Sequence, residues 1–155
     1  MRQFTSAHLR ELLENAASPC ISLYQPTHRG RPDNQQDPIR FRNMLKEMES
    51  ALLRTSRPAE VRDLTERFRK LADDRWFWDH RTEGLAILAS PRGFDVFDLQ
   101  RPVRELLTVS DSFHIKPLLR IVQSADRYQI LCLNRQEASL FEGNRDAMDQ
   151  VDMVN

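Results

Sequence analysis

The predicted architecture depends on the segment Gly84-Leu-Ala-Ile-Leu-Ala-Ser-Pro-Arg-Gly-Phe-Asp-Val-Phe-Asp-Leu99. Its apolar runs, Gly84 to Ser90 and Phe94 to Leu99, are rich in strand-forming residues and flank a Ser-Pro-Arg-Gly segment typical of a β-turn. They predict a β-hairpin. A further strand is predicted from Val103 to Val109, so a strand cluster occupies this part of the chain.

Upstream of the hairpin, the spacing of the apolar residues changes to that of amphipathic helices. Residues 5–16 predict a short helix, and residues 20–24 a strand followed by a polar loop from 25 to 36. Asp37-Pro38 is typical of a helix start, because an aspartate can cap the free amides and proline suits the first turn. Pro58 opens another helix. The inward faces of these two helices comprise Phe41, Met44, Leu45, Met48, Leu52, Val61, Leu64, Phe68 and Leu71.

Downstream of the hairpin the elements are shorter. A short helix is predicted over 117–122 and a second hairpin over 127–133 and 138–142. The order of elements indicates an α/β (mixed α+β) fold, a layered domain with a mixed sheet packed by helices. We divide the chain into an α/β domain (1–125), a hairpin (126–143) and a polar, frayed tail (144–155).

Composition limits the classes of protein to which the chain can belong. It has 155 residues, 40% of them apolar and 30% charged, with 23 basic and 23 acidic side chains. This excludes a disordered chain and argues against a general nucleic-acid or membrane-surface binder, although not against a local basic patch. No signal peptide or membrane-length apolar stretch is present, so we expect a cytoplasmic protein without a membrane partner. Cys20 and Cys132 lie in apolar runs and are expected to be buried free thiols.

A basic segment runs from His28 to Lys46. With His28 neutral, its five basic and two acidic residues give a local charge of +3 in a neutral chain. A basic loop beside a helix N-terminus can bind phosphate through backbone amides and arginine side chains. An ordered surface loop without a ligand explains the same residues. The basic residues are Arg29, Arg31, Arg40, Arg42 and Lys46, and the acidic ones are Asp33 and Asp37.

Other candidate sites have plainer explanations. Trp76-Phe77-Trp78 could stack on bases, but aromatic residues between a helix and a strand more often anchor that junction to the core. The four histidines are scattered without metal-ligand spacing. No P-loop, nucleotide-binding glycine motif or nucleophile elbow is present. We therefore expect no metal, no cofactor and no catalytic residues.

Several segments, in order, resemble a known family. They are Ile21-Ser-Leu-Tyr-Gln-Pro-Thr-His-Arg29, Gln36-Asp-Pro-Ile-Arg-Phe-Arg-Asn-Met-Leu45, Trp76-Phe-Trp-Asp-His80, Gly84-Leu-Ala-Ile-Leu-Ala-Ser-Pro91, Phe113-His-Ile-Lys-Pro-Leu-Leu119, Tyr128-Gln-Ile-Leu-Cys-Leu133 and Leu140-Phe-Glu-Gly143. Together they resemble the bacterial archaeo-eukaryotic release-factor-like family, baeRF. The resemblance extends over roughly residues 20–143.

The resemblance implies a translation-linked role. Members of the family have an N-terminal α/β domain, an RNase H-like middle domain and a C-terminal domain. This chain resembles the first domain and the opening hairpin of the second. The Gly-Gly-Gln and Asn-Ile-Lys-Ser elements that release factors use for peptidyl-tRNA hydrolysis and stop-codon reading are absent from the sequence.

Three hypotheses about function follow. The first is a non-catalytic binding module that contacts the ribosome or tRNA through His28, Arg29, Arg31, Arg40 and Lys116. The second is a structural or dimerisation domain that packs on further domains or pairs with a second copy through an open strand edge. The third is a small hydrolase that uses His28, Asp37 and His114, and it requires these side chains to converge.

Overall fold

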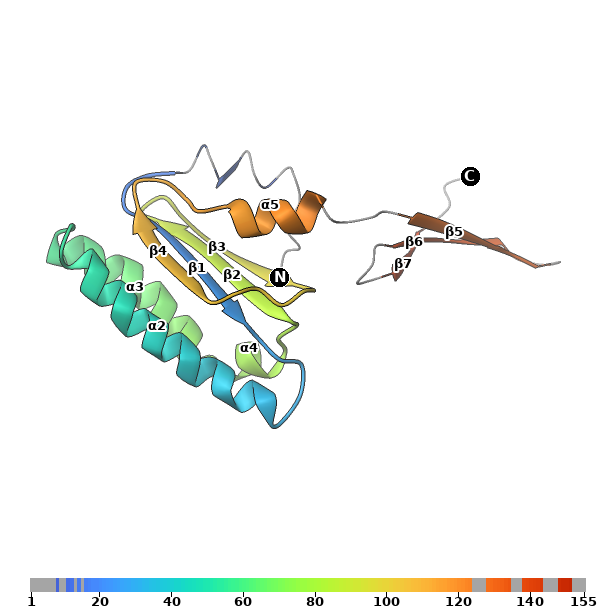
Figure 1. Cartoon of the computed structure of the whole chain (residues 1–155), viewed down its shortest axis with the longest axis horizontal. Coiled ribbons are helices and arrows are strands. Elements are labelled where there is room, and N and C mark those ends of the chain that lie inside the picture. The colour runs from blue at the N-terminus through green and yellow to red at the C-terminus, as the bar shows by residue number, and fades with distance from the viewer. Residues whose placement is uncertain are drawn as a thin grey trace.

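Two antiparallel sheets organise the chain (Figure 1). The structure is a computed structural model that describes residues 8, 11–12, 14, 16–123, 128–134, 138–143 and 148–151. The first sheet has the strand order β3-β2-β1-β4. Its strands are β1 (Cys20–Pro26), β2 (Gly84–Ser90), β3 (Gly93–Leu99) and β4 (Leu106–Ser110).

The predicted α+β layering is confirmed, but the sheet is not mixed, because its pairs β1–β2, β1–β4 and β2–β3 are all antiparallel. Two helices of equal length connect β1 to β2, namely α2 (Asp37–Leu52) and α3 (Pro58–Asp73), with 16 residues each. The second helix returns the chain to the end of the sheet where β1 finished. The next strand therefore runs opposite to β1, whereas a single crossover helix would have given a parallel pair.

Both faces of the first sheet are covered. α2 and α3 lie on one face and α5 (Lys116–Gln123) on the other (Figure 1). Side chains along β2 alternate between the two layers: Leu85 and Ile87 belong to the α2–α3 core, and Leu88 belongs to the core that contains Leu118 of α5. All seven residues of β2 are buried, which explains why its sequence is a continuous apolar run.

Asp37 does not cap α2, contrary to our prediction. A single 3-10 turn, η1 (Asp33–Gln36), leads directly into the helix, and the side chain at the N-cap position makes no capping bond. The Asp37 carboxylate instead accepts a hydrogen bond from the backbone N–H of His28 at 2.8 Å and lies 2.9 Å from the His28 ring Nδ1. Gln25 donates its side-chain amide to the Asp37 carbonyl at 2.7 Å. The fully buried Asp37 therefore links the start of α2 to the end of β1 through hydrogen bonds.

The aromatic segment forms α4 (Arg75–Asp79). Phe77 and Trp78 are buried, and Trp78 packs on Phe41 at 5.1 Å between ring centroids. The predicted anchoring role is confirmed for these two residues and wrong for Trp76, which is 65% exposed and stacks on the His80 ring. A five-residue helix presents only part of its surface to the core, so one aromatic side chain points outward.

The second sheet consists of β5 (Tyr128–Leu133), β6 (Ala138–Gly143) and β7 (Met148–Val151) in that order. The prediction of a frayed tail is wrong for 148–151, because β7 pairs with the otherwise open edge of β6. Cys20 is a buried free thiol as predicted, but Cys132 is exposed on β5. Figure 1 shows this sheet apart from the helices and the first sheet. The division into domains at 125 and 143 stays a prediction.

The remaining expectations are met in part. Most of the predicted helix at 5–16 lies outside the described residues, but His8, Glu11, Leu12 and Glu14 are helical. The strand predicted at 103–109 begins only at Leu106. No helix of the described part of the chain is both long and apolar enough to cross a bilayer.

Candidate nucleic-acid interface

A basic groove of about 620 Å³ lies between the segment that connects β3 to β4 and helix α5. Its polar lining contains the positively charged side chains of Arg101, Arg104, Lys116 and Arg120, together with His114 and one acidic residue, Glu105. Lys116 and Arg120 are four residues apart on α5, so they lie on the same side of the helix. Two stretches distant in sequence thus bring four cations to one surface.

The charge of the groove is largely uncompensated. Glu105 pairs with Arg40, which lies outside the groove lining, at 3.4 Å between the guanidinium Nε and the carboxylate. Within the described residues, Arg104, Lys116 and Arg120 have no ion-pair partner, and all three are exposed. A hollow lined by unpaired cations attracts an anionic ligand, and it does so most strongly at low ionic strength.

The groove has an apolar floor continuous with the core. Val103, Leu106 and Ile121 line it, and all three also pack against the core on the α5 face of the sheet. Pro102 and Pro117 lie beside them. The segments that carry the charged residues are therefore anchored to the core through their apolar neighbours.

Two hydrogen bonds tie the start of α5 to β1. The Tyr24 hydroxyl donates to the carbonyl of His114, and the backbone N–H of His114 donates to the Ser22 hydroxyl at 2.8 Å. Burial raises the pKa of Tyr24 above its ordinary value, so the hydroxyl stays protonated and able to donate further into the alkaline range than an exposed tyrosine would. Because His114 is held on β1, the backbone position of Lys116, two residues further on, is fixed relative to that strand.

Gly84 supports the other wall of the groove. A Cβ atom at this position would lie 2.7 Å from the carbonyl oxygen of Arg101 and 3.3 Å from Val103 Cγ2. The segment that carries Arg101 and Arg104 therefore packs directly on the backbone of β2. Any larger side chain at residue 84 would displace it.

Comparisons with known proteins bear on the fold. No protein-family model and no curated protein matches the chain. A solved structure described as an archaeal protein matches 95% of this chain with a TM-score of 0.51 and 18% identity, and an archaeal translation termination factor, aRF1, matches 95% with a TM-score of 0.52 and 19% identity. The fold is release-factor-like. The chain spans less than half of the two matched chains, 43% and 42% of their lengths.

Of the residues predicted to bind RNA in this release-factor-like domain, only Lys116 lines the groove. Arg29 pairs with Glu83 at 2.9 Å and donates to the Gln100 side chain at 2.9 Å. Arg40 pairs with Glu105, as described above. Each of these two arginines thus has a carboxylate beside it that competes with phosphate for the guanidinium group.

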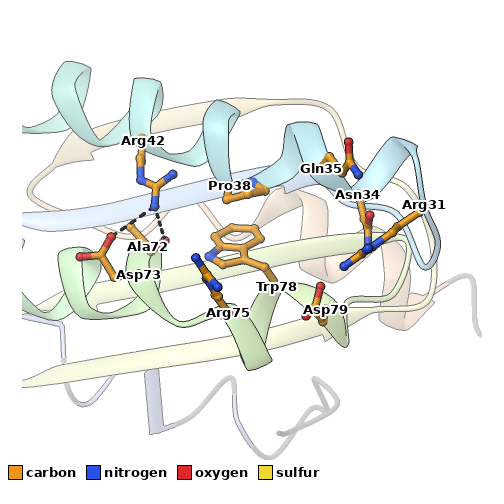
Figure 2. Close-up of a pocket in the computed structure, with 10 residues that line it drawn as sticks. All are labelled: Arg31, Asn34, Gln35, Pro38, Arg42, Ala72, Asp73, Arg75, Trp78 and Asp79. Atoms are coloured by element: carbon orange, nitrogen blue, oxygen red, sulfur yellow. Dashed lines mark hydrogen bonds and ion pairs between the residues drawn. The ribbon is translucent and has the colours of Figure 1, made fainter.

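Arg31 lies elsewhere, in a second hollow between the start of α2 and α4 (Figure 2). The loop from 27 to 36 thus directs its basic side chains to different surfaces. The structure does not gather the five predicted residues into one site, and their role in binding stays a prediction.

The three residues of the hydrolase hypothesis do not all converge. His28 and Asp37 form a close pair, with the carboxylate on the α2 side of the sheet. His114 lies on the α5 side, held by Ser22 and Tyr24 of β1. Since the sheet separates the layers, His114 is not placed to complete a site with the pair. In the described part of the chain, no three His, Cys, Asp or Glu side chains form a metal-binding group.

Sequence reasoning missed Arg101, Arg104 and Arg120. One signal was present: Lys116 directly precedes the helix predicted over 117–122 and stands four residues before Arg120, so a helix that began one residue earlier would carry both cations on one face. Nothing in the sequence relates them to residues 101 and 104, because that proximity depends on how β4 returns the chain along β1.

Proposed function

We propose that this chain is a non-catalytic RNA-binding domain of a release-factor-like protein, of the bacterial baeRF type, and that it contacts ribosomal RNA or tRNA through the basic groove. The observation that carries the proposal is the cluster of four cations around one carboxylate that is itself paired. The likeness of the fold to an archaeal translation termination factor and the family resemblance of the sequence support a partner in translation. The sequence contains no Gly-Gly-Gln element.

The charge distribution favours a local contact over general adhesion to RNA. The whole chain has a formal charge of zero, so long-range attraction to a polyanion is weak. The groove supplies Arg104, Lys116 and Arg120 as unpaired cations. Each phosphate that such a side chain neutralises contributes about 0.7 to 0.9 to the slope of log affinity against log salt concentration.

The test is binding to ribosomes and to bulk tRNA at several salt concentrations between 50 and 200 mM. Co-sedimentation reports the ribosome contact, and fluorescence anisotropy of labelled tRNA gives the dissociation constant. The triple variant Arg104→Ala/Lys116→Ala/Arg120→Ala should lower the salt slope by about 2 to 3. Because all three side chains are exposed, the variant should keep its fold, which circular dichroism verifies.

A matched control removes three cations from the far surface of the α2–α3 layer. Lys46, Arg62 and Arg67 are exposed there, and their alanine variant has the same net charge as the groove variant. Equal losses in both variants would show that net charge alone drives binding and would refute the groove. The double variant Arg29→Ala/Arg31→Ala tests the loop and should lower the slope by less than the groove variant.

A second candidate is self-association through β5. This strand lies at the edge of its sheet and exposes Ile130, Leu131 and Leu133. Exposed apolar edge strands pair with other chains. Sedimentation velocity over a wide concentration range tests the idea: a Leu131→Lys variant should be monomeric where the parent chain dimerises, and a parent chain that stays monomeric would contradict it.

A further inference from the structure

A second hollow, of about 610 Å³, lies on the α2–α3 side of the first sheet, at the start of α2 (Figure 2). η1 and the first turns of α2 form one wall, and the end of α3 with α4 forms the other. It shares no residue with the basic groove, which α5 borders on the opposite face. Its lining includes Arg31, Asn34, Pro38, Arg75, Trp78 and Asp79.

Several polar groups around this hollow lack partners. Arg42 is engaged, with its guanidinium 3.2 Å from both the Asp73 carboxylate and the Ala72 carbonyl. Arg31, Arg75 and Asp79, by contrast, have no ion pair or side-chain hydrogen bond with any residue that the structure describes. Figure 2 shows Arg31 and Asp79 near Asn34 at one end of the hollow, with Arg75 below the indole of Trp78.

Asn34 points to a ligand independently. Its exposed fraction is only 8%, it lines the hollow, and its side-chain amide has no hydrogen-bond partner among the described residues. Neither atom of the amide is fully buried, so the amide is open to the hollow. A ligand in the hollow would supply that partner.

The lining also selects the chemistry of the ligand. Two free guanidinium groups favour an anion such as phosphate, while the free carboxylate of Asp79 needs hydrogen-bond donors and repels a bare anion. Pro38 and the small exposed part of Trp78, 5% of the residue, add an apolar patch to the lining. A volume in the range of about 300 to 1,000 Å³ is typical of sites for molecules of nucleotide size.

We propose that this hollow binds a nucleotide, with the phosphate held by Arg31 and Arg75 and with Asp79 accepting hydrogen bonds from ribose hydroxyls or base N–H groups. Asn34 would bond to the base or the ribose. The nucleotide is either free or one residue of an RNA chain, because both present the same groups. The site does not depend on the basic groove, so it can exist whether or not the groove binds RNA.

Tryptophan fluorescence gives a direct test, because the chain has only two tryptophans. Trp76→Phe removes the exposed one and leaves Trp78, in the lining, as the reporter. AMP and GMP should change its emission in a saturable manner, and inorganic phosphate and adenosine should bind at least tenfold more weakly. Arg75→Ala and Asp79→Asn, made in this background, should each weaken nucleotide binding about tenfold. Arg67→Ala, an exposed arginine of α3 outside the hollow, should not change it.

The source of the nucleotide is distinguished by a five-nucleotide RNA. If this RNA binds at least tenfold more tightly than AMP, and Arg75→Ala weakens it, the occupant belongs to an RNA chain; similar affinities indicate a free nucleotide. The absence of a saturable signal with AMP, GMP and the RNA up to 10 mM would overturn the proposal. Binding of inorganic phosphate as tightly as AMP would also overturn it. The groove triple variant should keep full nucleotide affinity, so failure of the groove and failure of this site are distinguishable.

Discussion

Replacing Asp37 by asparagine distinguishes two possible roles of this residue, capping of α2 and contact with His28, because the two roles imply different losses of stability. At a helix N-cap, asparagine is as effective as aspartate, so the substitution would change the free energy of unfolding by less than about 0.5 kcal/mol. In the structure the carboxylate instead contacts the backbone N–H and the ring Nδ1 of His28, at 2.8 and 2.9 Å. Both carboxylate oxygens are used, one for each contact.

The expected loss follows from these two contacts. Hydrogen bonds to a charged group contribute about 1.5 to 3 kcal/mol each, and an asparagine keeps only one acceptor oxygen. Its NH2 group would face either the backbone N–H of His28 or the ring Nδ1, and Nδ1 can accept from it only if the ring proton moves to Nε2. We therefore expect Asp37→Asn to lower the free energy of unfolding by about 2 to 4 kcal/mol. This is a large part of the stability of an ordinary domain, about 5 to 15 kcal/mol.

Urea denaturation followed by tryptophan fluorescence measures this loss, since Trp78 is buried in the core that α2 covers. Asp33→Asn is the matched control, because Asp33 is exposed on η1 and makes no such contacts; it should change stability by less than about 0.5 kcal/mol. A loss for Asp37→Asn no larger than that of the control would refute the assigned role. His28→Ala removes only the ring contact and should cost less than Asp37→Asn.

Three further substitutions test the packing. Gly84→Ala should cost about 1 to 3 kcal/mol in urea denaturation and weaken tRNA binding, because its Cβ would displace the carbonyl of Arg101, whereas Gly30→Ala, with nothing within 4 Å of the new atom, should be neutral. Tyr24→Phe tests the raised pKa of the buried hydroxyl. The unfolded chain loses this proton first, near pH 10, so the stability of the parent chain should fall above about pH 10 by up to about 1.4 kcal/mol per pH unit. The phenylalanine variant should lack that contribution, and equal slopes in a pH series of denaturation curves would contradict the assignment. Phe68→Ala should lower stability by about 3 to 5 kcal/mol by thermal or urea unfolding, because this fully buried ring packs on two aromatic neighbours.

The sequence predicted most helices and strands because their signals are local. Prolines 38 and 58 mark the starts of α2 and α3, and the residues expected on the inner faces of these helices are buried or half-buried. The strands of the first hairpin begin and end within one residue of the prediction. Side-chain periodicity and proline geometry act over a few residues, so a single sequence contains them.

Burial, by contrast, depended on the neighbours that the fold supplies. β2 and β5 are both apolar runs, yet β2 is buried throughout and all six residues of β5 are exposed. β2 lies between two helical layers, while no helix covers β5 in the described part of the chain. For the same reason the prediction for Cys20 was correct and that for Cys132 was wrong.

Local sequence patterns specify most of the helices and strands, the absence of recognised catalytic motifs and the position of the basic loop. Only the tertiary structure decided which cations share a surface. It pairs Arg29 and Arg40 with carboxylates from distant connecting segments, and it brings residues 101 and 104 beside Lys116 and Arg120. The physical reason is that charge acts through space over several ångströms. Its effect depends on contacts between segments far apart in the chain, which no local pattern specifies.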